Sequence, residues 1–202
     1  MSTHSSAAEV TKINHEIESS EKNIFGFWVY IMTDCVLFAS LFATYAVLRK
    51  STNGGPEGSE IFSLPFVLTE TIILLTSSLT CGLAILSARN KNKSATLAWL
   101  FVTFILGMTF LTLELSEFRL LINEGNSWTA SAFLSSYFTL VGTHGLHIFI
   151  GLSWLAAMII AIVNSNLSSV NIRKLILFGM FWHFLDIVWI FIFTIVYLMG
   201  VL

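Results

Sequence analysis

Long apolar stretches alternate with short polar segments along this chain. Five stretches hold mostly apolar residues over the ~20 positions that a helix needs to cross a bilayer. They cover about residues 25–48, 66–88, 95–116, 137–163 and 175–199. They lack the strict alternation of membrane β-strands and are longer than such strands. The pattern therefore predicts an all-α polytopic membrane protein with five transmembrane helices.

The polar segments predict the organisation around these spans. Residues 1–23 hold several glutamates but lack the basic start and apolar run of a signal peptide. We interpret them as a polar cytoplasmic tail, either mobile or a short surface helix, ahead of a five-helix domain at 24–202. The connections are a Gly- and Pro-containing loop at 49–65, a polar loop at 117–136 and short basic loops at 89–94 and 164–174.

The distribution of lysine and arginine predicts the orientation, because cytoplasmic loops carry an excess of both. With the N-terminus in the cytoplasm, seven basic residues lie inside: Lys12, Lys22, Arg89, Lys91, Lys93, Arg173 and Lys174. Three lie outside: Arg49, Lys50 and Arg119. An odd number of spans then places the C-terminus outside, in the periplasm.

Composition narrows the function classes. Of the 202 residues, 55% are hydrophobic and only 11% are charged, whereas soluble domains carry about 25% charged residues. This excludes a soluble enzyme, a disordered regulator and a disulfide scaffold. The net charge of −2 leaves no basic patch for nucleic acid. No internal repeat supports an inverted-repeat transporter.

Ionisable side chains inside the spans are the candidate functional residues. An acid near the centre of a spanning helix costs about 2.5–3.5 kcal/mol on the insertion scale. Such groups must therefore face protein or water, be protonated, or pair with histidine. The candidate intramembrane network, structural with a role in proton handling left open, comprises Asp34, Glu70, Glu114, Glu117, His144, His147, His183 and Asp186.

Spacing and depth suggest how these groups are arranged. The two histidines of the fourth span, the pair Glu114 and Glu117, and the pair His183 and Asp186 are each three residues apart, which places each pair on one helix face. The histidines, Asp34 and Asp186 fall near the midplane, whereas Glu70 and Glu117 fall near the outer boundary. We expect Asp34 to approach His144 or His147.

Two interpretations of the histidines stay open at this point. The first is an interhelical hydrogen-bond network, and the second is a haem or metal site, including a bis-histidine haem between the fourth and fifth spans. A di-iron bundle would use Glu-x-x-His motifs, and this chain has none. Asp34 is likewise either a structural acid or a member of a proton pathway.

Four segments together resemble subunit III of the haem-copper terminal oxidases. They are FGFWVYIMTDCVLFASLFATYAVL (25–48), ETIILLTSS (70–78), FTLVGTHGLHIFIG (138–151) and FWHFLDIVWIFIFTIVYLMG (181–200), and LELSEF (113–118) adds a matching acid at Glu117. The GGP loop, FVLTET (66–71) and the count of five helices resemble the bacterial cytochrome o ubiquinol oxidase branch of that family.

The resemblance implies an accessory subunit of a proton-pumping ubiquinol oxidase in the bacterial inner membrane. Such a subunit carries no haem and no copper; these belong to the catalytic subunit I, against which it packs, with subunits II and IV in the same complex. The resemblance also implies bound phospholipid, support of proton uptake, and a match of Asp34, His144, His147, His183 and Asp186 to family positions. The rivals are a haem- or metal-binding membrane oxidoreductase and a small proton-coupled transporter.

Overall fold

The computed structural model describes the backbone of residues 3–56, 58–164 and 167–201, with side chains from residue 21 onward except 59 and 60. The chain divides into two compact parts, residues 1–37 and 38–202. Each part is described by itself.

The described residues are helical, without a β-strand. The elements are α1 (Thr3–Leu48), α2 (Gly58–Ile61), α3 (Leu64–Arg89), α4 (Lys93–Asn123), α5 (Ala132–Asn164), α6 (Ser169–Ile192), the π-helix η1 (Phe193–Leu198) and α7 (Met199–Val201). Five stretches are long and apolar enough to cross a membrane: Glu21–Leu48, Leu64–Arg89, Lys93–Asn123, Ala132–Asn164 and Ser169–Val201. The predicted all-α fold with five spanning helices is confirmed.

Several helices extend beyond the predicted spans, and two of these extensions bear on the candidate residues or the predicted tail. Helix α1 begins at Thr3, so most of the polar N-terminal segment continues into the first span as helix. Helix α4 continues to Asn123, which places Glu117 within a helix rather than at its edge. In both cases the helix runs beyond its apolar stretch, since helical hydrogen bonding does not stop where the membrane-facing residues end.

Polar residues fix several helix ends. The side chain of Asn92 accepts a hydrogen bond from the Ala95 N–H at the start of α4, at 3.1 Å. The hydroxyl of Ser168 accepts one from the Asn171 N–H at the start of α6, at 3.2 Å. Such N-caps satisfy backbone donors that the first helical turn leaves unpaired. After α4, Gly125 adopts a φ of 87°, a value that a residue without Cβ takes most easily.

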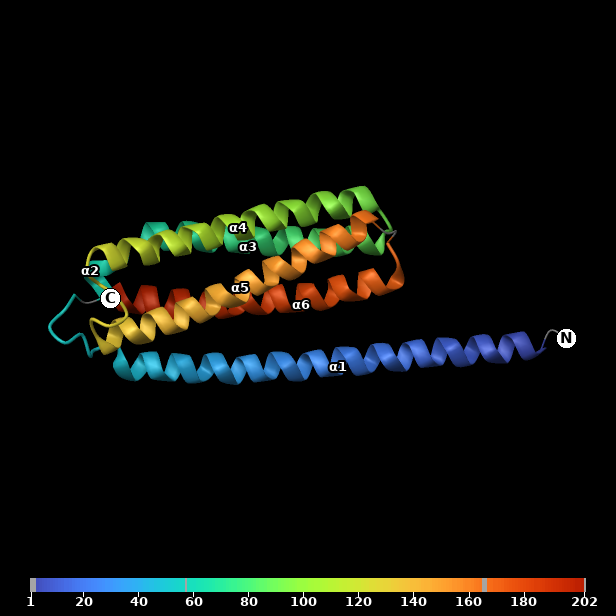
Figure 1. Ribbon diagram of the computed structural model, residues 1–202, viewed down its shortest axis with the longest axis horizontal. Helices are drawn as coiled ribbons and strands as arrows, with labels where there is room; N and C mark the ends of the chain where they lie inside the picture. Colours follow the sequence, from blue (N-terminus) through green and yellow to red (C-terminus); the bar gives the residue numbers. More distant parts are fainter. Residues whose placement is uncertain (1–2, 57, 165–166, 202) are drawn as a thin grey trace. The chain divides into compact units, whose positions relative to one another are not determined.

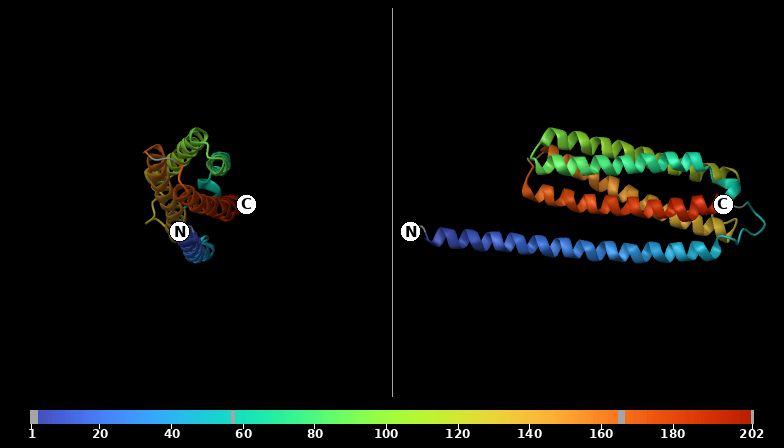
Figure 2. Two further views of the ribbon diagram at one scale, coloured as in Figure 1. Left: turned by 90° about the vertical axis from the view of Figure 1, so that its right-hand side faces the viewer. Right: turned by 180° about the vertical axis from the view of Figure 1, so that it is seen from behind.

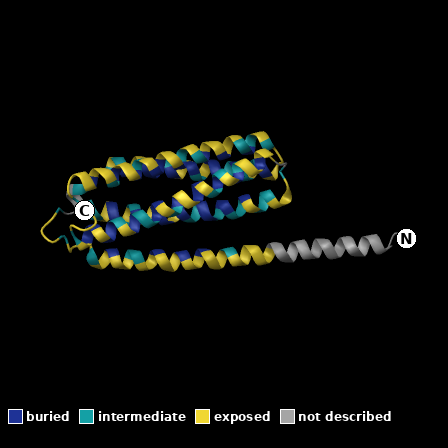
Figure 3. Cartoon of the chain, viewed as in Figure 1, coloured by how far each residue is buried: buried dark blue, intermediate teal, exposed yellow. Residues whose placement is uncertain are grey.

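Helices α3, α4, α5 and α6 form a ring (Figure 1). Each packs against two of the others: α3 on α4 and α6, and α5 on the same two. The end-on view shows these four helices around a shared interior (Figure 2, left). Buried residues line the inward faces, and exposed residues lie on the outward faces (Figure 3).

Trp182 of α6 lies fully buried in this interior, with none of its surface exposed. Its indole ring occupies a slot made by two glycines on neighbouring helices, Gly107 of α4 and Gly151 of α5. A Cβ added at Gly151 would lie 2.9 Å from the ring, and one at Gly107 would lie 3.1 Å from it. Only glycine leaves room for the ring at these positions.

We predict that Gly151→Ala destabilises the bundle by roughly 1–3 kcal/mol, the usual cost of forcing extra carbon into a packed core. Gly82→Ala is the matched control, because a Cβ at Gly82 meets nothing within 4 Å. Thermal unfolding in detergent measures both. Equal midpoints for the two variants would show that the slot around Trp182 can relax.

Candidate functional site: the intramembrane polar network

Hydroxyl groups on α3 join this helix to α6. The Trp182 indole N–H donates to the Ser77 hydroxyl at 3.0 Å, and the Trp189 indole N–H donates to the Thr71 hydroxyl, also at 3.0 Å. The higher-numbered tryptophan meets the lower-numbered residue of α3, so the helices run antiparallel. All four side chains are buried, where an unmade hydrogen bond would be costly.

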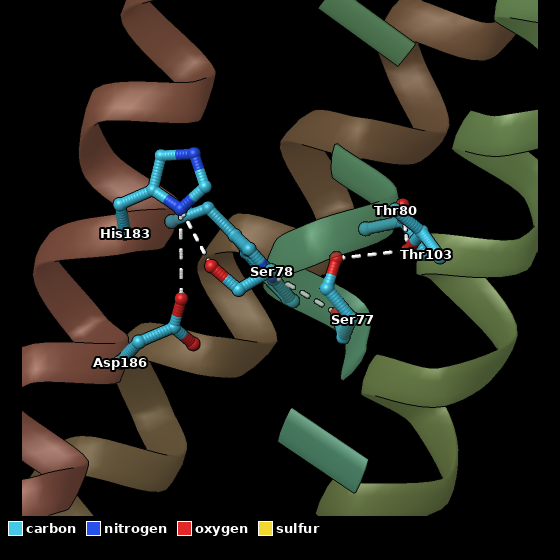
Figure 4. Close-up of polar contacts among 7 residues, drawn as sticks. Ser77, Ser78, Thr80, Thr103, His183 and Asp186 are labelled. Atoms are coloured by element: carbon cyan, nitrogen blue, oxygen red, sulfur yellow. Dashed lines mark hydrogen bonds and ion pairs between the residues drawn. The ribbon is translucent and has the colours of Figure 1, made fainter. Parts of the chain in front are cut away.

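His183 and Asp186 both lie on α6, where His183 meets Ser78 of α3 (Figure 4). The Ser78 hydroxyl of α3 lies 2.6 Å from His183 Nδ1 in a hydrogen bond. Asp186 Oδ2 lies 3.7 Å from the same nitrogen, within ion-pair range but beyond hydrogen-bond distance. The side chain of Asp186 is buried, whereas that of His183 is 44% exposed. The two residues lie on the shared helix face that their spacing predicts, with Ser78 as a third member of the group.

A third hydroxyl contact joins α3 to α4. The Thr80 and Thr103 hydroxyls lie 2.8 Å apart in a hydrogen bond, on the opposite side of α3 from His183 (Figure 4). Each threonine also bonds a carbonyl of its own helix, that of Ser77 or of Trp99. Helix α3 thus presents hydroxyls to both of its neighbours.

The three glutamates of α3 and α4 form a second cluster, near the end of the bundle that holds the C-terminus. The carboxyl groups of Glu70, Glu114 and Glu117 lie near one another. The Tyr197 hydroxyl of η1 donates to Glu117 Oε2 at 3.3 Å and lies 3.0 Å from the Tyr137 hydroxyl of α5. The predicted common face of Glu114 and Glu117 is confirmed, since both are buried.

The other two glutamates lack such a contact among the described residues. Neither carboxyl oxygen of Glu70 nor of Glu114 has a hydrogen-bond partner there. Glu114 lies against α5, where a Cβ on Gly145 would come within 2.8 Å of its carboxyl oxygen. Burying an ionised carboxylate without a partner is far more costly than burying a neutral one, so the cluster favours protonated glutamates.

The histidines of α5 occupy different surroundings. His144 is fully buried and makes no hydrogen bond to a described residue. Its ring stacks on Trp189, with centroids 5.2 Å apart, and meets Phe110 edge-on at 6.0 Å. His147 is partly buried, and its Nδ1 lies 2.8 Å from the Thr143 carbonyl of its own helix. Aromatic packing, rather than an interhelical hydrogen bond, holds His144.

Asp34 lies on α1 in the part formed by residues 1–37, whereas His144 and His147 lie in the other part. Within its own helix, Asp34 hydrogen-bonds the side chain of Tyr30, one turn earlier. Its predicted approach to His144 or His147 stays a prediction.

The arrangement suits the joining of helices. Among the described side chains, no three of histidine, cysteine, aspartate or glutamate lie together so that they could hold a metal ion. The polar groups instead meet hydroxyls and indoles of neighbouring helices, which hold helices together in lipid.

Sequence reasoning from ionisable residues missed the partners. These are Thr71, Ser77, Ser78, Tyr137, Trp182, Trp189 and Tyr197. One signal was present, because the two tryptophans are seven residues apart, the repeat of facing helices. The π-helix that carries Tyr197 left no such signal.

Comparison with known proteins identifies the family. Residues 6–201 match the family model described as cytochrome c oxidase subunit III. The chain belongs to this family.

Relatives from both branches of the family are similar over nearly the whole chain. Cytochrome bo(3) ubiquinol oxidase subunit 3 of Pseudomonas aeruginosa is 55% identical, covering 94% of this chain and 90% of the relative. Cytochrome c oxidase subunit 3 of Bacillus sp. strain PS3 is 45% identical, over 93% and 90%. Quinol oxidase subunit 3 of Bacillus subtilis is 40% identical, over 93% and 92%. The recognition of subunit III of a terminal oxidase from the sequence is confirmed.

We predict that His183 and Asp186 are energetically coupled in this subunit III chain. Double-mutant cycles for membrane hydrogen bonds average about 0.6 kcal/mol, and we expect a coupling of that order between His183→Ala and Asp186→Ala. Unfolding in detergent would measure it. The control pairs His183→Ala with Thr112→Ala, since the Thr112 hydroxyl bonds a carbonyl of its own helix. Additive effects in both cycles would show that the observed proximity contributes no stability.

Proposed function

We propose that this chain is the non-redox subunit III of a bacterial ubiquinol oxidase, which reduces oxygen to water and pumps protons. The observation that carries the proposal is the 55% identity, over 94% of the chain, to a protein named subunit 3 of a ubiquinol oxidase. The relative named as a cytochrome c oxidase subunit is less similar, at 45% identity.

The mechanical role follows from the two faces of the bundle. Its polar groups are turned inward, where helices α3 to α6 bond one another. Its outward faces are apolar, with residues such as Leu79 at 65% and Ile160 at 62% exposure. Such a surface suits lipid or the spanning helices of a partner. We propose that it packs on catalytic subunit I, which holds the haems and copper, and that subunits II and IV belong to the same complex.

The proposed placement is the bacterial cytoplasmic membrane, with the N-terminus inside and the C-terminus in the periplasm. The support is the excess of lysine and arginine on one side of the spans. In this orientation the glutamate cluster and Tyr197 lie toward the periplasmic side. The Ser78–His183–Asp186 group lies nearer the middle of the membrane.

We propose a mainly structural role for the intramembrane network, including Asp34, and a lipid-binding role for the surface of the subunit. A neutral acid that accepts a hydrogen bond from another helix, as Glu117 does from Tyr197, holds helices together at little cost, because no charge is buried. The carboxyl groups of Glu70, Glu114 and Glu117 can also hold and release protons, and so support sustained proton uptake by the complex.

Asp34→Ala is expected to lower the stability of the complex by roughly 1 kcal/mol, in the range measured for membrane hydrogen bonds. Asp34→Asn is the control, because an amide keeps hydrogen-bonding capacity but cannot exchange a proton. We expect its stability and its oxygen consumption over many turnovers to match the unchanged protein. A normal stability with falling oxygen consumption in Asp34→Asn would assign Asp34 to proton transfer.

Deleting this chain from its complex tests the accessory role. We expect the remaining complex to keep its full haem and copper content, measured by absorption spectra and metal analysis. We also expect it to lose thermal stability or to lose activity during turnover, because subunit I would expose surface normally covered by this chain.

Two outcomes would contradict the proposed accessory function and favour a rival function. Loss of a haem or copper together with the chain, or a haem spectrum of the isolated chain, would favour the metal-binding oxidoreductase. Proton or solute flux by the isolated chain in vesicles would favour the proton-coupled transporter.

A further inference from the structure

A cavity of about 530 Å³ lies at the end of the bundle where α1 and α7 end. Its walls include two cations that follow α1 directly, Arg49 and Lys50, together with Tyr45, Phe133 and Met199. Polar and apolar groups contribute similar shares of the wall. The cavity belongs entirely to residues 38–202, and the intramembrane network described above does not use it.

The backbone beside the cavity is held in place by hydrogen bonds. The Phe133 N–H of α5 donates to the Ser51 carbonyl at 3.2 Å, which ties the loop after α1 to the first turn of α5. The Arg49 N–H donates to the Tyr45 carbonyl at 2.9 Å. Tyr45 and Phe133 are themselves buried, with ring centroids 6.2 Å apart. The cations therefore extend from a fixed backbone beside a fixed aromatic wall.

The charge of this cavity is not balanced by the described side chains. Neither Arg49 nor Lys50 forms an ion pair with any of them. The sequence also holds Glu57 and Glu60 within eleven residues of Arg49, but their side chains lie outside the described set. Two adjacent cations suit an anion with several oxygens, because a guanidinium binds phosphate through paired hydrogen bonds and an ammonium adds a point charge.

We propose that this cavity binds the headgroup of an anionic phospholipid, with the phosphate between Arg49 and Lys50. The glycerol and the first acyl carbons then lie along Tyr45, Phe133 and Met199. An anionic headgroup at the bilayer surface gains Coulomb attraction from two adjacent cations in the wall of the cavity. The inference deepens the lipid-binding part of the proposed function and rests on it.

The position in the membrane favours a lipid over free phosphate. The cations follow the end of a helix long enough to span the bilayer, which places them at headgroup depth. The apolar wall would gain nothing from an inorganic ion, whereas it covers the hydrocarbon of a lipid. A lipid held here would join the ends of α1, α5 and α7.

The test uses the complete oxidase complex in nanodiscs that contain phosphatidylglycerol and phosphatidylcholine. Native mass spectrometry counts the phosphatidylglycerol molecules that stay bound as detergent strips the remaining lipid. We expect Arg49→Gln with Lys50→Gln to lose one retained phosphatidylglycerol. The singly substituted proteins should each lower its occupancy several-fold, which keeps the test valid if the double variant fails to assemble.

The matched control removes two charges elsewhere. Arg89→Gln with Lys91→Gln alters the basic loop between α3 and α4, outside the cavity, and should retain the lipid. The swap Arg49→Lys with Lys50→Arg keeps both charges and should also retain it. Millimolar inorganic phosphate should not displace the lipid from the unchanged protein.

Three results would overturn the proposal. Unchanged lipid retention in Arg49→Gln with Lys50→Gln would show that these two cations do not hold the lipid. Equal loss in the control would show a general charge effect, and displacement by phosphate would show a simple anion site. Haem and copper content, measured on the same samples, reports the oxidase function separately, so a failure of this site is distinguishable from a failure of the proposed function.

Discussion

The indole of Trp182 is the point at which the four-helix ring meets. It starts on α6, donates its N–H to Ser77 of α3, and fills the slot between Gly107 of α4 and Gly151 of α5. In lipid, burial of apolar surface does not drive helices together, since acyl chains are as apolar as leucine. Close packing and hydrogen bonds must do so instead, and this one side chain supplies a hydrogen bond to α3 and close packing against α4 and α5.

The remaining polar contacts extend this arrangement along the bundle. Thr71 and Trp189 repeat the hydroxyl–indole bond at one end of the α3–α6 interface, and Thr80 and Thr103 hold α3 to α4. Hydroxyl and indole groups carry no charge, so their burial does not incur the cost of desolvating an ion. The hydrogen bonds between neutral hydroxyl and indole groups hold the helices together, and the acids and histidines add further contacts to these.

This division of polar interior and apolar exterior explains how the chain fits a multi-subunit oxidase. A bundle that turns most of its polar groups inward can leave a largely apolar surface for partner helices and lipid. The π-helix η1 carries the buried Tyr197, whose hydroxyl meets Glu117 and Tyr137. Such π segments within helices often accompany functional sites, which is consistent with a role for the glutamate cluster beyond packing.

Apolar length and periodicity are local properties of the chain, and the membrane imposes a fixed helix length on them. The sequence alone therefore determined the five spans, the family and the shared faces of Glu114 with Glu117 and of His183 with Asp186. Which residue on a different helix meets each polar group depends on helix rotation and packing. Only the tertiary structure decided that Ser78 joins His183, that Tyr197 reaches Glu117, and that His144 stacks on Trp189 instead of forming a hydrogen bond. Helix rotation is set by the volume of side chains across the interface, such as the glycine slot around Trp182, and no stretch of one helix encodes that fit by itself.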